Sequence, residues 1–184
     1  VRNLQNAYGY YVDRMMWSDV VDLFAPDPVV RIDGVGEYRG ADGVRRAMER
    51  MGPEGISHGR LNDHPIFDLI VDVRPGGREA IARGIEIGML GDTHRRAGSW
   101  EFSVFRNRFV KDGPLWKLQE VHTTPLLAAD YAEGWGKGGT FARAERGAPA
   151  FLEVSGRADR SPGGPAEAVG VADLRRRLAR SHAY

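Results

Sequence analysis

Hydrophobic residues recur at spacings of three and four over the first 25 residues of this 184-residue chain. They are Leu4, Tyr8, Tyr11, Met15, Val20, Leu23 and Phe24. This period is typical of a helix with one buried face, and it predicts a single helix over residues 1–25. Pro26 and Pro28 lack the backbone N–H that a continuing helix requires, so we expect the helix to end before them.

Short hydrophobic runs bounded by glycine and proline fill the middle of the chain. They predict two short strands and a helix, at 29–33, 35–39 and 41–51, followed by four longer strands, at 66–73, 80–90, 99–110 and 115–123. Helices followed by a series of neighbouring strands are typical of an α+β fold. We therefore predict a cone in which the helices pack on a strongly curved, mostly antiparallel sheet.

The composition changes in the last third of the chain. Residues 137–165 are rich in glycine, alanine, arginine and proline and show little periodicity, while the pattern of residues 171–180 is typical of a short basic helix. We predict one domain over residues 1–135 and a C-terminal arm over residues 136–184. The arm is interpreted either as a solvated tail or as an extended segment that packs on a neighbouring subunit.

Charge and composition exclude several classes of protein. Charged residues make up 28% of the chain but the net charge is only +1, so the basic excess of a nucleic-acid-binding protein is missing. No hydrophobic run approaches the roughly 18 residues that cross a membrane. The chain has no cysteine, which excludes disulfides and thiolate nucleophiles and fits a cytoplasmic protein. Because the helical pattern already starts at Val1, we expect the natural chain to begin upstream, and a removed signal peptide is the alternative.

The spacing of the histidines and of the glycine pairs in the predicted strands supports neither a metal-dependent nor a nucleotide-dependent enzyme. The five histidines include no HExxH motif and no pair at helical i, i+4 spacing, so we predict no metal site. The GxSxG elbow of serine hydrolases does not occur, and the glycine pairs at Gly34/Gly36 and Gly84/Gly88 follow neither the GxGxxG nor the Walker pattern, so they are interpreted as bends in strands. We expect no cofactor, which leaves acid–base chemistry carried by side chains alone.

Asp13 is the residue that points to such chemistry. It lies within the hydrophobic stretch from Tyr8 to Trp17, and an ionised carboxylate is costly to bury unless a partner pairs with it. A carboxylate beside a histidine holds the imidazole in one tautomer and raises its basicity, so the pair can remove a proton from carbon or oxygen. Spacing alone does not decide which histidine is the partner. It also leaves the alternative that Asp13 is a helix acid paired with Arg14 or Arg45.

Four segments, in this order, resemble one known family. They are residues 10–27 with Tyr-x-x-Asp-x-x-x-Trp and Leu-Phe-Ala-Pro-Asp, residues 34–40, residues 58–62 with His-x-x-x-Asn, and residues 105–117 with Asp-Gly and Trp-Lys. Together they resemble the SnoaL-like branch of the NTF2-like superfamily. Its members include scytalone dehydratase, bile-acid dehydratase and hexachlorocyclohexane dehydrochlorinase. The resemblance covers residues 1–135 and implies the same cone-shaped fold.

The resemblance also implies a catalytic dyad. In the family's enzymes an acid of the first helix and the histidine of the His-x-x-x-Asn element form the dyad at the bottom of a conical pocket. By position these residues are Asp13 and His58, and His64 is the second candidate for the histidine. The chain departs from scytalone dehydratase at Gly34, where that enzyme has a water-activating tyrosine.

Aromatic and polar residues elsewhere in the chain are candidates for contacting a substrate. They are Tyr8, Tyr11, Trp17, Tyr38, His94, Phe105, Arg106 and His122. Alternation along the strand predicted at 99–110 places Glu101 and Phe105 on one face and Arg106 on the other. The pattern does not show which face is buried, so either Glu101 or Arg106 is expected to be functional.

Together these features predict a cofactor-independent lyase that acts in an apolar pocket on a small hydrophobic, aromatic and hydroxylated compound. His58, supported by Asp13, would remove a proton, and water or formaldehyde would leave; the resemblance implies the second outcome for lignin-derived aromatics. The alternatives are an isomerase or polyketide cyclase with the same dyad, a non-catalytic binding module, and a structural subunit like the small subunit of ring-hydroxylating dioxygenases. We expect a homo-oligomer, a dimer or a trimer, without a nucleic-acid or membrane partner.

Overall fold

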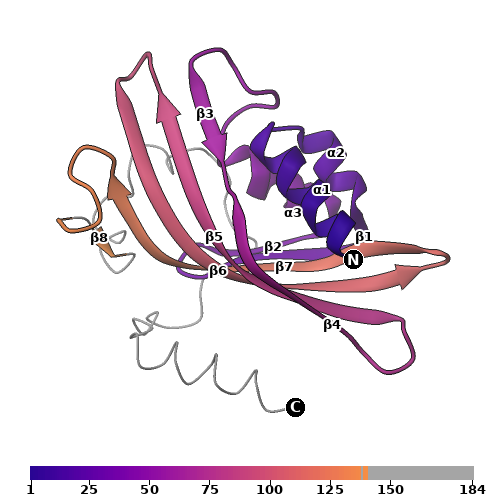
Figure 1. Ribbon diagram of the computed structural model, residues 1–184. Helices are drawn as coiled ribbons and strands as arrows, with labels where there is room; N and C mark the ends of the chain where they lie inside the picture. Colours follow the sequence, from indigo (N-terminus) through magenta and orange to yellow (C-terminus); the bar gives the residue numbers. More distant parts are fainter. Residues whose placement is uncertain (138, 141–184) are drawn as a thin grey trace.

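The structure is a computed structural model that describes residues 1–137, 139 and 140 of the chain (Figure 1). The C-terminal arm predicted over residues 136–184, including its basic helix, lies almost entirely outside the described residues. Among the helices of the described part, none has the length and hydrophobicity that crossing a membrane requires.

Helices and strands alternate early in the chain and give way to long strands. In order they are α1 (Arg2–Asp13), α2 (Trp17–Asp22), β1 (Phe24–Ile32), β2 (Gly36–Arg39), α3 (Gly40–Glu49), β3 (Arg60–Asp63), β4 (Ile66–Val73), β5 (Glu79–Asp92), β6 (Ala97–Asp112), β7 (Leu115–Asp130) and β8 (Gly139–Thr140). The strands form one sheet in the order β2-β1-β7-β6-β5-β3, in which β4 also pairs with β5 and β8 with β7. The pairing of β1 with β7 is parallel and the other pairings are antiparallel.

The sheet is strongly curved, and the helices lie against its concave face. Figure 1 shows β5, β6 and β7 bending along their length, with α1, α2 and α3 grouped together on the inner side of the bend. The pairing of β6 with β7 shifts register at Phe102/Ser103 and at Arg108/Phe109, and such bulges increase the local bend of a strand. The predicted α+β cone with a mostly antiparallel sheet is therefore confirmed.

The N-terminal helix is interrupted, and the prediction of one helix was wrong. Met15 lies between α1 and α2 with a φ of 55°, which a right-handed helix does not contain. Its carbonyl oxygen accepts a 2.7 Å hydrogen bond from the Gly55 backbone N–H. Met15 and Trp17 are both fully buried, which explains why the hydrophobic pattern continues through the break. Pro26 and Pro28, expected to follow a helix, lie within β1.

The predicted strands are present, mostly with different ends. β4 has the predicted limits, whereas β5, β6 and β7 extend beyond theirs and β1 begins at Phe24. Strand β3 was not predicted, because its sequence Arg-Leu-Asn-Asp is too polar and too short to give a strand pattern. Because β3 lies between His58 and His64, this omission changes where the two histidines are expected to lie.

Burial along β6 shows which face of the sheet is the inner one. Ser103, Phe105 and Asn107 are buried, whereas Arg106 is exposed. Glu101 is on the same face as the buried set. Of the two candidates on this strand, Glu101 therefore belongs to the concave face and Arg106 to the outer face.

Asn107 connects α1 to the sheet through buried hydrogen bonds. Its Nδ2 donates to Gln5 Oε1 (2.9 Å), and its Oδ1 accepts from the His122 backbone N–H (3.2 Å). Asn107 and Gln5 are each 1% exposed. Because water cannot replace these bonds, each group depends on the other for its partner.

Asn107→Ala is expected to lower the free energy of unfolding by about 2 kcal/mol, because Gln5 Oε1 would be left buried without a donor. Urea unfolding followed by tryptophan fluorescence measures this change. Arg106→Ala is the control, because it truncates the neighbouring exposed side chain. It should change the free energy of unfolding by less than about 0.5 kcal/mol. Equal losses in the two variants would show that the amide bond between helix and sheet contributes nothing specific.

Candidate functional site

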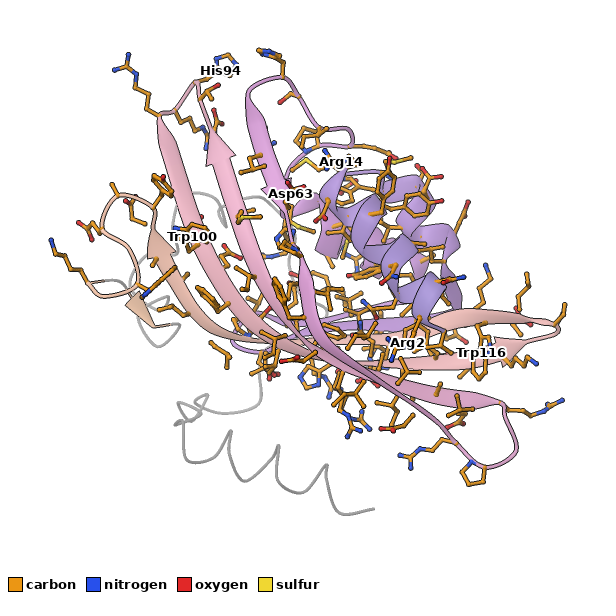
Figure 2. The ribbon with its side chains drawn as sticks, viewed as in Figure 1. Arg2, Arg14, Asp63, His94, Trp100 and Trp116 are labelled. Carbon is orange, nitrogen blue, oxygen red and sulfur yellow. The ribbon has the colours of Figure 1, made fainter. Side chains whose placement is uncertain are left out.

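Strand β3 holds the C-terminal end of α1 in place. Asn62 Nδ2 donates to the Val12 carbonyl oxygen (3.1 Å), and Asn62 is buried. Arg14 forms an ion pair with Asp63 (3.1 Å), and Figure 2 shows the two side chains meeting between the helix and the strand. These contacts on either side fix the position of Asp13, the last residue of α1.

Asp13 binds His64 through a single carboxylate oxygen. Asp13 Oδ1 accepts from the His64 backbone N–H (2.9 Å) and lies 2.9 Å from His64 Nδ1. Because an ionised carboxylate only accepts hydrogen bonds, Nδ1 carries the proton and the Nε2 lone pair is available to accept one. The two side chains are 18% and 11% exposed, so the pair is largely removed from water.

The predicted contact between Asp13 and His58 is wrong. His58 is exposed, in the turn before β3, whereas His64 follows the end of β3 beside α1. The four residues of β3 move the chain by about 13 Å between these two positions. The turn containing His58 instead lies near the β5–β6 turn, because Thr93 N–H donates to the Gly59 carbonyl oxygen (2.9 Å).

Two glutamates of the sheet face the histidine. Glu86 on β5 is paired with Ser103 on β6 and accepts a hydrogen bond from its hydroxyl (3.2 Å), while Glu101 is paired with Gly88. Glu101 was one of the two candidates predicted on its strand, and Glu86 was missed. Among the residues that the structure describes, no three histidine or carboxylate side chains are arranged to hold a metal ion.

Asp13, His64, Glu86 and Glu101 form one cluster, in which the pKa values of His64, Glu86 and Glu101 are raised. Burial lowers the pKa of His64, but the hydrogen bond to Asp13 and the charges of Glu86, Asp13 and Glu101 raise it above its ordinary value. Burial raises the pKa of Glu86, and His64 and the Ser103 hydroxyl only partly offset this. Burial likewise raises the pKa of Glu101, against the effect of His64. His64, Glu86 and Glu101 therefore retain their protons to a higher pH than the same groups in water would.

Tyr8 also takes part in this electrostatic environment. Burial raises the pKa of its hydroxyl, and the negative charges of Glu86 and Asp13 raise it further. Its ring packs edge-on against Phe24, with a centroid distance of 6.1 Å. Tyr8 therefore contributes a neutral phenol on the α1 side of the cluster.

Gly88 makes room for the imidazole. A Cβ atom at this position would lie 3.0 Å from Glu101 Cβ, 3.2 Å from His64 Cδ2 and 3.4 Å from His64 Nε2. The ring edge that carries Nε2 therefore lies over the backbone of β5, next to the side chain of Glu101. A larger residue at position 88 would push these groups apart.

The first 122 residues match the sequence model of the SnoaL-like domain. The chain belongs to the SnoaL-like family. This family is part of the NTF2-like superfamily, so the resemblance inferred from the four sequence segments is confirmed. Comparison with the curated proteins gave no match.

Solved structures support the same fold for this SnoaL-like chain. A proposed scytalone dehydratase from Novosphingobium aromaticivorans is 19% identical, with a TM-score of 0.61 over 71% of this chain and 84% of that one. The hexachlorocyclohexane dehydrochlorinase LinA-type3 from Novosphingobium barchaimii is 12% identical, with a TM-score of 0.60 over 71% and 87%. At these identities the likeness shows the fold alone.

The departure from scytalone dehydratase at Gly34 has a structural basis. Gly34 lies in the turn between β1 and β2 with a φ of 79°, a conformation that glycine adopts without strain. The Val35 N–H closes this turn by donating to the Ile32 carbonyl oxygen (3.0 Å). A tyrosine at position 34 would be strained in this backbone.

Two of the aromatic residues predicted to bind a substrate are part of the core of this SnoaL-like domain. Trp17 and Tyr38 are both 0% exposed, so they have no surface to offer to a ligand. The Trp17 indole N–H donates to the Gly52 carbonyl oxygen (3.0 Å). Tyr11 is half-buried and packs edge-on against Tyr10. The predictions for Trp17 and Tyr38 were therefore wrong.

The polar residues predicted to bind a substrate lie away from the Asp13–His64 pair. His94 is exposed in the β5–β6 turn, where Figure 2 places it at the tip of the hairpin. Arg106 is exposed on the outer face of β6. His122 instead binds Asp33, with Nε2 2.8 Å from Oδ1. Phe105 is the member of the predicted set that shares the inner face of β6 with Glu101.

Proposed function

We propose that this protein is a cofactor-independent lyase in which His64 removes a proton and Asp13 orients and supports the imidazole. The observation that carries the proposal is the double contact of His64 with Asp13 Oδ1, which leaves the Nε2 lone pair free beside the inner face of β5. A raised pKa makes that nitrogen a stronger base than a solvated histidine. The pairing replaces the Asp13–His58 dyad expected from the sequence.

The reaction proposed is an elimination. His64 Nε2 takes a proton from a substrate carbon, the electron pair of the broken C–H bond forms a double bond, and the group on the adjacent carbon leaves. The imidazolium that forms is stabilised by the Asp13 carboxylate. The names of the two structural relatives, a dehydratase and a dehydrochlorinase, both describe eliminations and support this reaction class.

The substrate proposed is a small hydrophobic and hydroxylated aromatic compound. Tyr8, which is half-buried, supplies aromatic surface on the α1 side of the cluster, where it would favour a ring, whereas Phe105 is 5% exposed and belongs to the core. Water is the proposed leaving group, and release of formaldehyde from a hydroxymethyl group is the variant to be tested beside it. The homo-oligomer expected from the sequence also stays a prediction.

A panel of aromatic alcohols that carry an acidic C–H next to the hydroxyl-bearing carbon tests the proposal. 4-Hydroxy-4-phenylbutan-2-one is a suitable member, because its dehydration forms a conjugated enone that absorbs in the ultraviolet. We expect enone formation by the wild-type protein and its loss in His64→Ala. Deuterium exchange at the acidic carbon without elimination would instead support an isomerase. Absence of both reactions across the panel would favour the binding module.

Gly88→Ala is expected to lower kcat/KM for the elimination by about tenfold to a hundredfold, because the added methyl group would displace the His64 ring by a fraction of its width. Steady-state kinetics with the best substrate of the panel measures the effect. Gly136→Ala is the matched control, since no atom of the described residues lies within 4 Å of the position of the added carbon. Unchanged kinetics in Gly88→Ala would show that the position of the ring is not set by this contact.

A further inference from the structure

We propose that Glu101 is a second catalytic group, the acid that protonates the leaving oxygen, so that the site is built for hydroxyl rather than halide as the leaving group. This inference rests on the proposed function of His64 as the base. Glu101 lies on the sheet and has no role in the reaction proposed for Asp13 and His64 alone. Its role as the acid also narrows the class of substrate to alcohols.

Glu101 and the base flank the same residue of the sheet. A Cβ atom built on Gly88 would lie 3.0 Å from Glu101 Cβ and 3.4 Å from His64 Nε2, so the acid side chain and the free ring nitrogen pack over the same glycine and lie close to each other. A 1,2-elimination requires this arrangement, because the proton and the leaving group depart from adjacent carbon atoms. A substrate that reaches both groups would have its C–H bond toward His64 and its hydroxyl toward Glu101.

The surroundings of Glu101 favour its neutral form. Glu86 faces it from β5, His64 faces it from the link between β3 and β4, and the residue opposite on β7 is Ala128. Among the described residues no hydrogen bond to the Glu101 carboxyl is found. Burial and the negative charge of Glu86 raise its pKa, and only His64 acts in the opposite direction. A carboxyl group that stays protonated near neutral pH can donate a proton.

Glu86 is less suited to this role. Its Oε1 already accepts the Ser103 hydroxyl (3.2 Å), which favours the carboxylate. When Glu86 is ionised, its charge favours the neutral form of Glu101. The hydrogen bond from Ser103 to Glu86, which Glu101 lacks, therefore makes Glu101 the better proton donor of the two.

The proton balance of the proposed step closes within the site. His64 Nε2 gains the proton of the substrate carbon, and the C–H electron pair becomes the new double bond. The C–O bond breaks with its electron pair on oxygen, and the Glu101 carboxyl proton transfers to that oxygen, so water leaves. Transfer of a proton from the His64 imidazolium to the Glu101 carboxylate then restores both groups for the next turnover.

The test compares two leaving groups on one carbon skeleton. Glu101→Gln should lower kcat/KM for 4-hydroxy-4-phenylbutan-2-one by at least about a hundredfold, the usual loss for a missing general acid. The rate for the 4-chloro analogue should stay within about threefold, because chloride leaves without a proton. A retained rate for the chloride also shows that the variant is folded. In the wild type, only the alcohol reaction should slow as the pH rises through the pKa of Glu101.

A second measurement does not depend on a substrate. Infrared difference spectra at neutral pH should show a protonated carboxyl band that is lost in Glu101→Gln and retained in Glu86→Gln. Equal losses of the alcohol and chloride reactions, no loss of either, or an ionised Glu101 at neutral pH would each overturn this inference alone. Unchanged rates for both substrates in His64→Ala would instead overturn the proposed function.

Discussion

Replacing His64 with alanine is expected to lower kcat/KM for the elimination by at least about a hundredfold, the scale on which a general base contributes. The variant removes the only histidine bonded to Asp13 in the described part of the chain, and with it the lone pair at Nε2. Glu86 and Glu101 remain, with raised pKa values, but in the described part of the chain neither is hydrogen-bonded to Asp13. Steady-state kinetics with the alcohol identified in the panel measures this loss.

His58→Ala is the control that the sequence makes necessary. His58 belongs to the His-x-x-x-Asn element on which the family resemblance was based, yet its side chain is exposed in the turn before β3. We expect its removal to change kcat/KM by less than about twofold, as for an exposed residue outside the site. A large loss of kcat/KM in His58→Ala together with a small loss in His64→Ala would support the Asp13–His58 dyad predicted from the sequence. It would contradict His64 as the base.

The pH dependence follows from the direction of the pKa shift of His64. The base must be neutral to accept a proton, so activity is lost as the pH falls through the pKa of His64. Because this pKa is raised, the loss begins at a higher pH than for a solvated histidine. The groups of the cluster interact, so the observed midpoint belongs to the cluster as a whole. A midpoint below the ordinary value of a histidine would contradict the contact with Asp13.

The fold was largely predictable because its strands carry regular patterns. The β4, β5 and β6 segments are hydrophobic runs that turn-forming residues separate, so local preference and tertiary structure agree. The helix break could not be predicted in the same way. Met15 and Trp17 stay buried on both sides of it, and the hydrogen bond from Gly55 that stabilises the break comes from a distant part of the chain.

The site was only partly predictable, for reasons that differ between residues. Asp13 could be found because a carboxylate within a hydrophobic helix needs a partner. The choice between His58 and His64 depended on strand β3, whose four mostly polar residues give no signal in the sequence. A distance of six residues was therefore enough to select the wrong histidine. When the strand between two candidate histidines is missed, their positions in the sequence do not show which one contacts Asp13.

Glu86 shows how a hydrophobic pattern can indicate the wrong face. Strand alternation places Glu86 on the face opposite to Ile85 and Ile87, and two isoleucines on one face favour burial of that face and exposure of Glu86. The pairing with β6 shows the opposite, because Glu86 lies across from Ser103, which is buried. Gly84 and Gly88 on either side of Glu86 were the available signal. A charged residue between two glycines on one strand face has space around it that a ligand or a side chain can fill.

Asp13→Asn should lower kcat by about a hundredfold or more, while the fold is retained. The amide keeps the shape of the carboxylate, so it can still contact the His64 backbone N–H. It does not supply the negative charge that raises the pKa of His64, and it no longer requires Nδ1 to carry the ring proton. Both changes weaken Nε2 as a base. Nitrogen-15 NMR of the imidazole should accordingly show a lower pKa and a mixture of tautomers.

The chain contains a matched control for this substitution. Asp33 binds His122 at 2.8 Å on β7, outside the cluster, and also accepts a hydrogen bond from Thr124 (2.6 Å). Asp33→Asn removes the charge from an Asp–His pair of the same kind, and we expect kcat to stay within about twofold of the wild type. If both variants lose activity equally, the effect reflects general destabilisation and not the orientation of a base. If only Asp13→Asn loses activity and the pKa of His64 falls with it, the carboxylate acts through the imidazole, as the two hydrogen bonds to its Oδ1 require.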